Sequence, residues 1–97
     1  MHERELRAFV ATAQIGRMDL AAKELGYSQP AISYQIKCLE RALGVRLFMR
    51  NPAGAQLTRE GEIILLSAQS ALLLLDNIKS MSRSSAEELL SAAGIAT

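Results

Sequence analysis

A mainly α-helical fold is predicted for this chain of 97 residues by three observations. Apolar residues recur at helical spacing along most of the chain, and two of the predicted helices are separated by only three residues. A single Asn-Pro-Ala-Gly turn signal lies between two short extended stretches. The apolar content of 49 % supplies a small core, and this length accommodates one domain. We therefore expect three short helices, a two-stranded hairpin and a long final helix.

Apolar spacing and stop signals predict the first two helices. The first helix presents one apolar face and ends near Gly16; this face consists of Leu6, Phe9, Val10 and Ala13. The second helix covers residues 19–25, with Asp19 as its expected N-cap. Gly26 can take the left-handed conformation that ends a helix, so it is the expected stop.

The third helix is predicted over residues 29–43, with Ser28 as its N-cap. Pro30 is tolerated in the first turn, because the amide it lacks would have no partner there. One apolar stripe runs along this helix until Gly44 and contains Ile32, Ile36, Leu39 and Leu43. Since only three residues join it to the helix at 19–25, the pair has the spacing of a helix-turn-helix.

A short two-stranded wing is predicted after the third helix. Residues 51–54 suit a type I turn, with Asn first, Pro second and Gly fourth. Isolated hairpins are marginal in water, so the wing must lean on the helices, with Leu57 and either Leu47 or Phe48 as its expected anchors. The sequence thus predicts a winged helix-turn-helix domain over residues 1–58.

A long final helix is predicted over residues 59–82, with Thr58 as its N-cap, and residues 83–97 are expected to form a hinge or tail. Five consecutive apolar residues at 71–75 surround this helix rather than forming a stripe. Packing onto the first helix and a dimer seam both account for such a run. We favour dimerisation, because the small body cannot cover every side of the helix. The residues expected in the seam are Ile64, Ala68, Ala71, Leu72, Leu74, Leu75 and Ile78.

The net charge of +1 hides a division of charge along the chain. Residues 1–58 hold eight basic and five acidic side chains, whereas residues 59–97 hold three basic and five acidic ones. From Lys37 to Arg59, five basic side chains accompany a single acidic one, Glu40. We interpret this as a local basic patch on the predicted domain, which suits contact with a nucleic-acid backbone.

The side of the third helix opposite its apolar stripe carries hydrogen-bonding and cationic residues. Gln29 and Ser33 lie toward its N-terminal end, and Tyr34, Lys37 and Arg41 follow. Glutamine can bond an adenine edge twice, serine pairs with any base or a phosphate, and lysine suits guanine or backbone. An apolar back with such a front is what entry into the major groove requires. A merely solvated face is the alternative; the tight turn, the wing and the local charge favour DNA contact.

Composition excludes several other classes of function. The single cysteine, Cys38, rules out a disulfide framework and a cysteine-based zinc cluster, and it has no resolving cysteine for a redox switch. The only histidine, His2, lies at a fraying terminus, so we expect no enzyme, no metal and no cofactor. The apolar stretch at 63–75 is too short to span a bilayer and no secretory signal is apparent. We therefore expect a cytoplasmic protein without membrane contact.

A set of residues stands at fixed spacings between roughly residues 4 and 80. It consists of Phe9-Val10-Ala11, Ala21-Ala22, Leu25, Ser28 to Ser33, Gln35-Ile36, Leu39-Glu40, Leu43-Gly44, Leu47-Phe48, Arg50, Leu57-Thr58 and Gly61. This set resembles the N-terminal DNA-binding domain of LysR-type transcriptional regulators. The resemblance implies a winged helix-turn-helix, a linker helix that dimerises and a dyad-symmetric promoter site. It also implies a larger effector-binding domain of periplasmic-binding-protein type, which 97 residues cannot contain, so a small-molecule effector would act outside this chain.

The resemblance places base-reading positions at Gln29, Pro30, Ser33 and Tyr34, and it places Arg50 in the wing. Together with neighbouring residues of the helix-turn-helix, the full set expected to contact DNA is Arg17, Ser28, Gln29, Pro30, Ala31, Ser33, Tyr34, Lys37 and Arg50. Three departures from the family pattern stand out: Arg17 and Asp19 near the start of the second helix, where Ser or Thr is frequent, Tyr34 where arginine is common, and Ala53 at the wing tip. Whether the intact protein is a dimer or a tetramer stays open. The competing hypothesis is a helical protein-interaction or oligomerisation module whose long helix is the functional surface.

Overall fold

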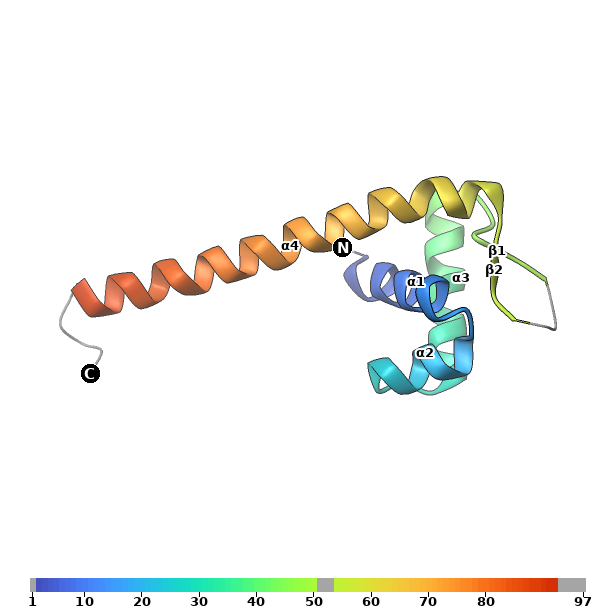
Figure 1. Cartoon of the computed structure of the whole chain (residues 1–97), viewed down its shortest axis with the longest axis horizontal. Helices are drawn as coiled ribbons and strands as arrows, with labels where there is room; N and C mark the ends of the chain where they lie inside the picture. Colours follow the sequence, from blue (N-terminus) through green and yellow to red (C-terminus); the bar gives the residue numbers. More distant parts are fainter. Residues whose placement is uncertain (1, 51–53, 93–97) are drawn as a thin grey trace.

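The computed structural model describes residues 2–50 and 54–92 of the chain. Its elements, in chain order, are α1 (Glu3–Ile15), α2 (Met18–Leu25), α3 (Gln29–Leu43), β1 (Phe48–Met49), β2 (Gln56–Leu57) and α4 (Arg59–Ala92). Figure 1 shows α1 to α3 and the wing gathered into a head at one end of α4, which extends far beyond the head. The predicted mainly α-helical, winged helix-turn-helix architecture with a long final helix is confirmed.

Most of the predicted helix ends are confirmed. The hydroxyl of Ser28 accepts a hydrogen bond from the Ala31 amide at 3.2 Å, and that of Thr58 accepts one from the Gly61 amide at 2.9 Å. Gly26 has a φ of 76°, which permits the turn between α2 and α3 that a residue with a side chain would disfavour. Gly16 and Gly44 end α1 and α3 in the same way.

The prediction that Asp19 caps the second helix is wrong. The N-cap residue of α2 is Arg17, whose side chain makes no capping hydrogen bond. Asp19 lies within the first turn of α2, and its carboxylate is bonded by the Arg17 guanidinium instead. A carboxylate in the first turn still complements the positive end of the helix, so the residue supports α2 by charge rather than by capping.

The core of the head forms where α1, α3 and the first strand meet. Phe9, Ile32, Leu39 and Leu47 are all fully buried there. The ring of Phe9 meets that of Phe48 edge to face, with centroids 5.6 Å apart, which joins α1 to the wing. Leu43 was expected in the apolar stripe of α3, yet it is 45 % exposed. The buried stripe therefore ends one turn before the helix does.

The wing is a two-stranded antiparallel sheet that packs against the helices of the head. Phe48 pairs with Leu57, and Met49 pairs with Gln56. The expected anchors are confirmed, because Leu47 and Phe48 are buried and Leu57 is half-buried. The Glu40 carboxylate of α3 accepts hydrogen bonds from the Leu47 and Phe48 amides at 2.7 and 3.4 Å. The predicted turn at residues 51–54 lies largely outside the described residues.

Helix α4 is longer than predicted, since it ends at Ala92 rather than near Ser82. Part of the segment 83–97 that was expected to be a hinge or tail is therefore helical. At its first turn, α4 approaches the backbone of the head so closely that a Cβ on Gly61 would lie 2.3 Å from the Leu47 carbonyl oxygen. Residues Arg59–Ser84 of α4 are also long and apolar enough to cross a membrane, judged by length and composition alone.

Candidate nucleic-acid interface

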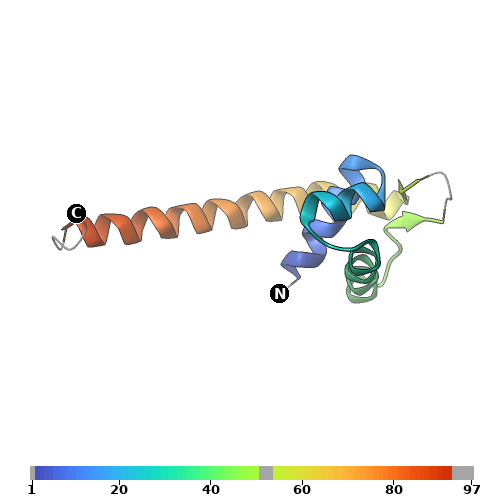
Figure 2. The same ribbon diagram turned by 90° about the horizontal axis from the view of Figure 1, so that it is seen from below.

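The helix-turn-helix presents α3 on the outside of the head. Figure 1 shows α3 running away from the base of α4, so that its N-terminal end and α2 lie on the far side of the head. Figure 2, which looks nearly along α3, places it at the edge of the head between α2 and the wing. Its apolar side is buried through Ile32, Ile36 and Leu39. The opposite side of α3 therefore faces outward, as major-groove insertion requires.

The outward side of α3 carries most of the predicted DNA-contact residues in accessible positions. Gln29, Pro30 and Lys37 are exposed, and Tyr34 is 66 % exposed. Ala31 and Ser33 are half-buried, and the exposed Ser28 uses its hydroxyl oxygen to cap the helix. These side chains form a front of an amide, hydroxyls and a cation near the N-terminal half of the helix. Such groups match the donors and acceptors of base edges.

Tyr34 has Cys38 as a neighbour on the next turn of α3. A hydrogen bond with Cys38 raises the pKa of Tyr34, with an electrostatic contribution from the same thiol, whereas Arg41 acts in the opposite direction. The phenol consequently stays protonated at neutral pH and remains a hydrogen-bond donor. Cys38 is half-buried.

Two further predicted contact residues lie beside α3. Arg17 precedes α2, and its Nε and Nη2 atoms donate to the Asp19 carboxylate at 3.1 and 2.7 Å. This pair is exposed, and Arg17 lowers the pKa of Asp19. A phosphate would therefore compete with Asp19 for the guanidinium. Arg50 is exposed directly after β1, so the wing can bring a cation to the DNA backbone next to α3.

The predicted seam residues of α4 fall into two groups. Ala68 and Leu72 are buried within the single chain, at 3 % and 8 % exposure, because α4 packs on α1; Ile64 and Leu75 are half-buried. Ala71, Leu74 and Ile78 are exposed. The sequence reasoning missed other exposed apolar residues on this helix, namely Ile63, Leu66, Leu73 and Met81. Of these, only Met81 continues the spacing of three and four that residues 71, 74 and 78 begin, and that spacing was the available signal for it.

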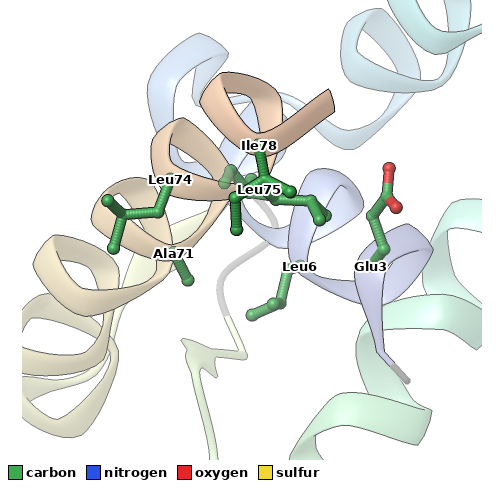
Figure 3. Close-up of a pocket in the computed structure, with 7 residues that line it drawn as sticks. Glu3, Leu6, Ala71, Leu74, Leu75 and Ile78 are labelled. Atoms are coloured by element: carbon green, nitrogen blue, oxygen red, sulfur yellow. The ribbon is translucent and has the colours of Figure 1, made fainter. Parts of the chain in front are cut away.

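An apolar groove lies between α1 and α4 (Figure 3). It encloses about 310 Å³ and is lined by Glu3, Leu6, Ala71, Leu72, Leu74, Leu75 and Ile78. Figure 3 shows Leu75 and Ile78 reaching from α4 toward α1, with Glu3 at the end of the groove. Only Glu3 supplies a charged group to this lining. The groove therefore suits an apolar partner more than a polar ligand.

Four charged side chains join α1 to α4 at the end of this groove. Arg7 donates through Nε to Glu3 at 2.9 Å and through Nη2 to Asp76 at 2.8 Å. Lys79 donates to both Glu3 carboxylate oxygens, at 3.1 and 3.0 Å. The hydrogen bonds from Lys79 and then from Arg7 lower the pKa of Glu3, while those to Asp76 and Glu3 raise the pKa of Arg7. Glu3 and Arg7 therefore stay ionised at neutral pH, and the signs of the four side chains alternate from one contact to the next.

Sequence comparison finds regulators among the relatives of this chain. The family profile described as "Bacterial regulatory helix-turn-helix protein, lysR family" matches residues 4–62. The HTH-type transcriptional regulator TfdT of Cupriavidus pinatubonensis (strain JMP 134 / LMG 1197) is 37 % identical over 86 residues, which is 89 % of this chain. The same match covers 38 % of TfdT, so the chain spans less than two-fifths of that relative's length.

Structural comparison finds DNA-binding domains solved with DNA. The CbnR_DBD–DNA complex matches with a TM-score of 0.82 and 41 % identity, over 89 % of this chain and 99 % of that one. The BenM_DBD/benA site 1 DNA complex matches with a TM-score of 0.82 and 35 % identity, over 89 % of this chain and 97 % of that one. The similarity therefore includes the head and much of α4.

Proposed function

Because the chain belongs to the lysR family of bacterial regulatory helix-turn-helix proteins, we propose that it is the sequence-specific DNA-binding part of a transcriptional regulator. It binds a dyad-symmetric promoter site as a homodimer, with the two α3 helices in successive major grooves. The observation that carries this proposal is the outward side of α3, where Gln29, Tyr34 and Lys37 stand exposed on a helix whose opposite side is buried. Both DNA-bound neighbours, CbnR_DBD and BenM_DBD, support it.

Each group on this surface has a distinct role in the proposed complex. Gln29 reads a base edge through its amide, and Ser33 adds a hydroxyl contact close by. Tyr34 stacks on a sugar or a thymine methyl and donates its phenolic hydrogen. Lys37, Arg17 and Arg50 contact phosphates, which fix the register of the protein but carry no sequence information.

The homodimer forms through α4 and the groove beside it. Leu74 and Ile78 are 61 % and 59 % exposed, and with Met81 they continue one stripe along the helix. A second copy of α4 would cover this stripe and fill the apolar groove against α1. A bilayer is the rival occupant, because Arg59–Ser84 is apolar enough to span one. Asp76 and Lys79, which are paired to α1, count against insertion of this helix.

The longer regulator is proposed by analogy with relatives such as TfdT, of which the chain spans 38 %. In such a protein a small-molecule effector acts through a further domain, and its binding changes transcription through the DNA-bound dimer. The protein is cytoplasmic and performs no catalysis in this role.

The decisive experiment selects bound sequences from a random duplex pool and then measures affinity against salt. For six to eight neutralised phosphates per dimer, log affinity should fall with log salt at a slope of roughly −5 to −7. Gln29→Ala should weaken binding to the selected site by ~1–3 kcal/mol and binding to random DNA little. Gln14→Ala is the matched control, since Gln14 is an exposed glutamine on α1. If the selection enriches no common sequence, or if Gln29→Ala loses equal affinity for the selected and the random DNA, base reading by Gln29 is contradicted.

The alternative function, an oligomerisation module without specific DNA binding, makes the opposite prediction. It requires that no gel shift occurs with duplex DNA at micromolar protein, at low or moderate salt. A gel shift that is abolished by competing DNA of the selected sequence, but not by random DNA, excludes this alternative.

The dimer is tested by sedimentation of matched charge substitutions on α4. Leu74→Glu places a carboxylate in the groove-side stripe and should give a monomer, whereas Leu66→Glu alters an equally exposed leucine outside the groove lining and should not. Loss of the dimer in the Leu66 variant alone would move the seam to another side of α4. Co-flotation of the unaltered protein with lipid vesicles would favour the bilayer instead.

A further inference from the structure

The head holds α4 at three places along its length. Its first turn rests on the backbone of Leu47 through Gly61, and its next turns are buried against the head at Ala68 and Leu72. The third attachment is ionic and lies farther along α4, where Asp76 and Lys79 meet Arg7 and Glu3 of α1. Among the described residues, no other hydrogen bond or ion pair joins α4 to the head farther along α4 than these.

The ionic attachment has the geometry of a network rather than of separate pairs. Glu3 and Arg7 stand one turn apart on α1, and Asp76 and Lys79 stand about one turn apart on α4. Lys79 bonds Glu3, Glu3 bonds Arg7, and Arg7 bonds Asp76, with all donor–acceptor distances between 2.8 and 3.1 Å. Each side chain therefore lies next to a side chain of opposite charge. The acidic residue of each helix faces the basic residue of the other.

This network can constrain the direction of α4 relative to the head, whereas the buried apolar contacts constrain it less. Burial of Ala68 and Leu72 is non-directional, and one of these side chains is a single methyl group. Charge-assisted hydrogen bonds require particular distances and angles. A helix of 34 residues is about 51 Å long, so a small rotation about its base displaces its far part by several ångströms.

We propose that the network of Glu3, Arg7, Asp76 and Lys79 sets the direction of α4 relative to the head and thereby the half-site spacing that the dimer accepts. The inference rests on the proposed function, because it requires a DNA-binding dimer joined through α4. In a two-fold dimer the seam lies on α4, so the angle between α4 and the head fixes the separation of the two α3 helices. These four residues are positioning residues and need not touch DNA.

A charge swap on α4 tests the network without altering the net charge. The double variant D76K/K79E puts like charges opposite Arg7 and Glu3, so attraction at the two contacts becomes repulsion. The quadruple variant E3K/R7E/D76K/K79E restores alternating signs in the inverted order. The matched control R83E/E87R swaps two exposed charges of α4 beyond the head. Half-exposed ion pairs contribute little to stability, so the variants are expected to fold, which circular dichroism checks.

The readout is affinity for a series of duplexes that carry two selected half-sites at spacings varied one base pair at a time. The unaltered protein should prefer one spacing. In D76K/K79E the preference over the next spacing should fall about tenfold, which corresponds to ~1.4 kcal/mol. Affinity for a single half-site should be unchanged, because α3 and the wing are intact. The quadruple variant should recover the spacing preference, and R83E/E87R should retain it.

The outcomes separate the inference from the function on which it rests. If the unaltered protein binds no duplex, the proposed function fails. If it binds with a spacing preference that D76K/K79E keeps, the positioning role is wrong and the function stands. A uniform loss at every spacing and at the single half-site also overturns the positioning role. Should the swap prevent folding, the uncharged variant D76N/K79Q replaces it, with the same expected direction and a smaller effect.

Discussion

Gly61→Ala tests how closely α4 must approach the head. Gly61 is buried in the first turn of α4, where its amide donates to the Thr58 hydroxyl. An added Cβ would lie 2.3 Å from the Leu47 carbonyl oxygen and 3.1 Å from Leu57 Cδ2. At an exposed helical site the same change would stabilise a protein by about 1 kcal/mol. Here we expect the sign to reverse.

The magnitude follows from the contact with the Leu47 backbone. To bring a distance of 2.3 Å to an ordinary contact of about 3.4 Å, α4 and the Leu47 backbone must separate by about 1 Å. Overpacking of this kind costs roughly 1–3 kcal/mol, and a displaced cap costs about 1 more. After subtraction of the gain in helix propensity, a net loss of ~1–3 kcal/mol remains. For a domain of this size that loss lowers Tm by about 4–24 °C.

Thermal and urea unfolding at one fixed protein concentration measure this change, because dimerisation would otherwise shift the midpoint. Ser70→Ala is the control: it is an exposed site on the same helix, and alanine there should leave stability unchanged or raise it by a few tenths of a kcal/mol. A Gly61→Ala protein as stable as the unaltered one, or more stable, would refute the close approach of the two backbones.

Three other changes have defined outcomes. Thr12→Val should stabilise the protein by about 1 kcal/mol in urea unfolding, because the buried Thr12 hydroxyl has no hydrogen-bond partner among the described residues; Thr12→Ser should destabilise it instead. Glu40→Ala should cost ~1–3 kcal/mol by the same measurement, since it leaves the Leu47 amide unpaired; full stability would show that water replaces the carboxylate. Lys79 and Arg7 lower the pKa of Glu3 below its ordinary value of 4.5, so its stabilising contribution is complete above that pH and is lost as pH falls through the lower folded-state pKa. Melting curves from pH 7 to about pH 3 should therefore decline less steeply in Glu3→Gln, and identical slopes would contradict this.

Local signals made most of the head predictable from sequence. The caps at Ser28 and Thr58, and the apolar spacing of α1 and α3, depend on residues within one or two turns of each other. Asp19 misled the prediction because aspartate is favoured both as an N-cap and within the first turn. Which of the two roles Asp19 takes depends on the residue at which α2 begins. Because α2 begins at Met18, Arg17 is the N-cap residue, and the sequence does not specify a helix start to one residue.

The surface of α4 was less predictable, because burial there depends on where another helix crosses. Ala68 and Leu72 resemble their apolar neighbours in sequence, yet they are the ones that α1 covers. The ionic network could not be anticipated either, since Glu3 and Lys79 are 76 residues apart. Interactions at such separation follow from the packing of the helices, and packing is set by side chains along the whole contact.

Helix α1 contacts both parts of this molecule for which a role is proposed, α3 and α4. It packs against α2 and α3 on one side and against α4 on the other. Phe9 belongs to the core that supports α3, while Leu6 lines the groove where a second copy is proposed to dock. Rigid packing of this kind transmits displacement, because a filled core cannot deform without cost. A displacement of α4 would therefore act through α1 on α3, the helix proposed to contact DNA.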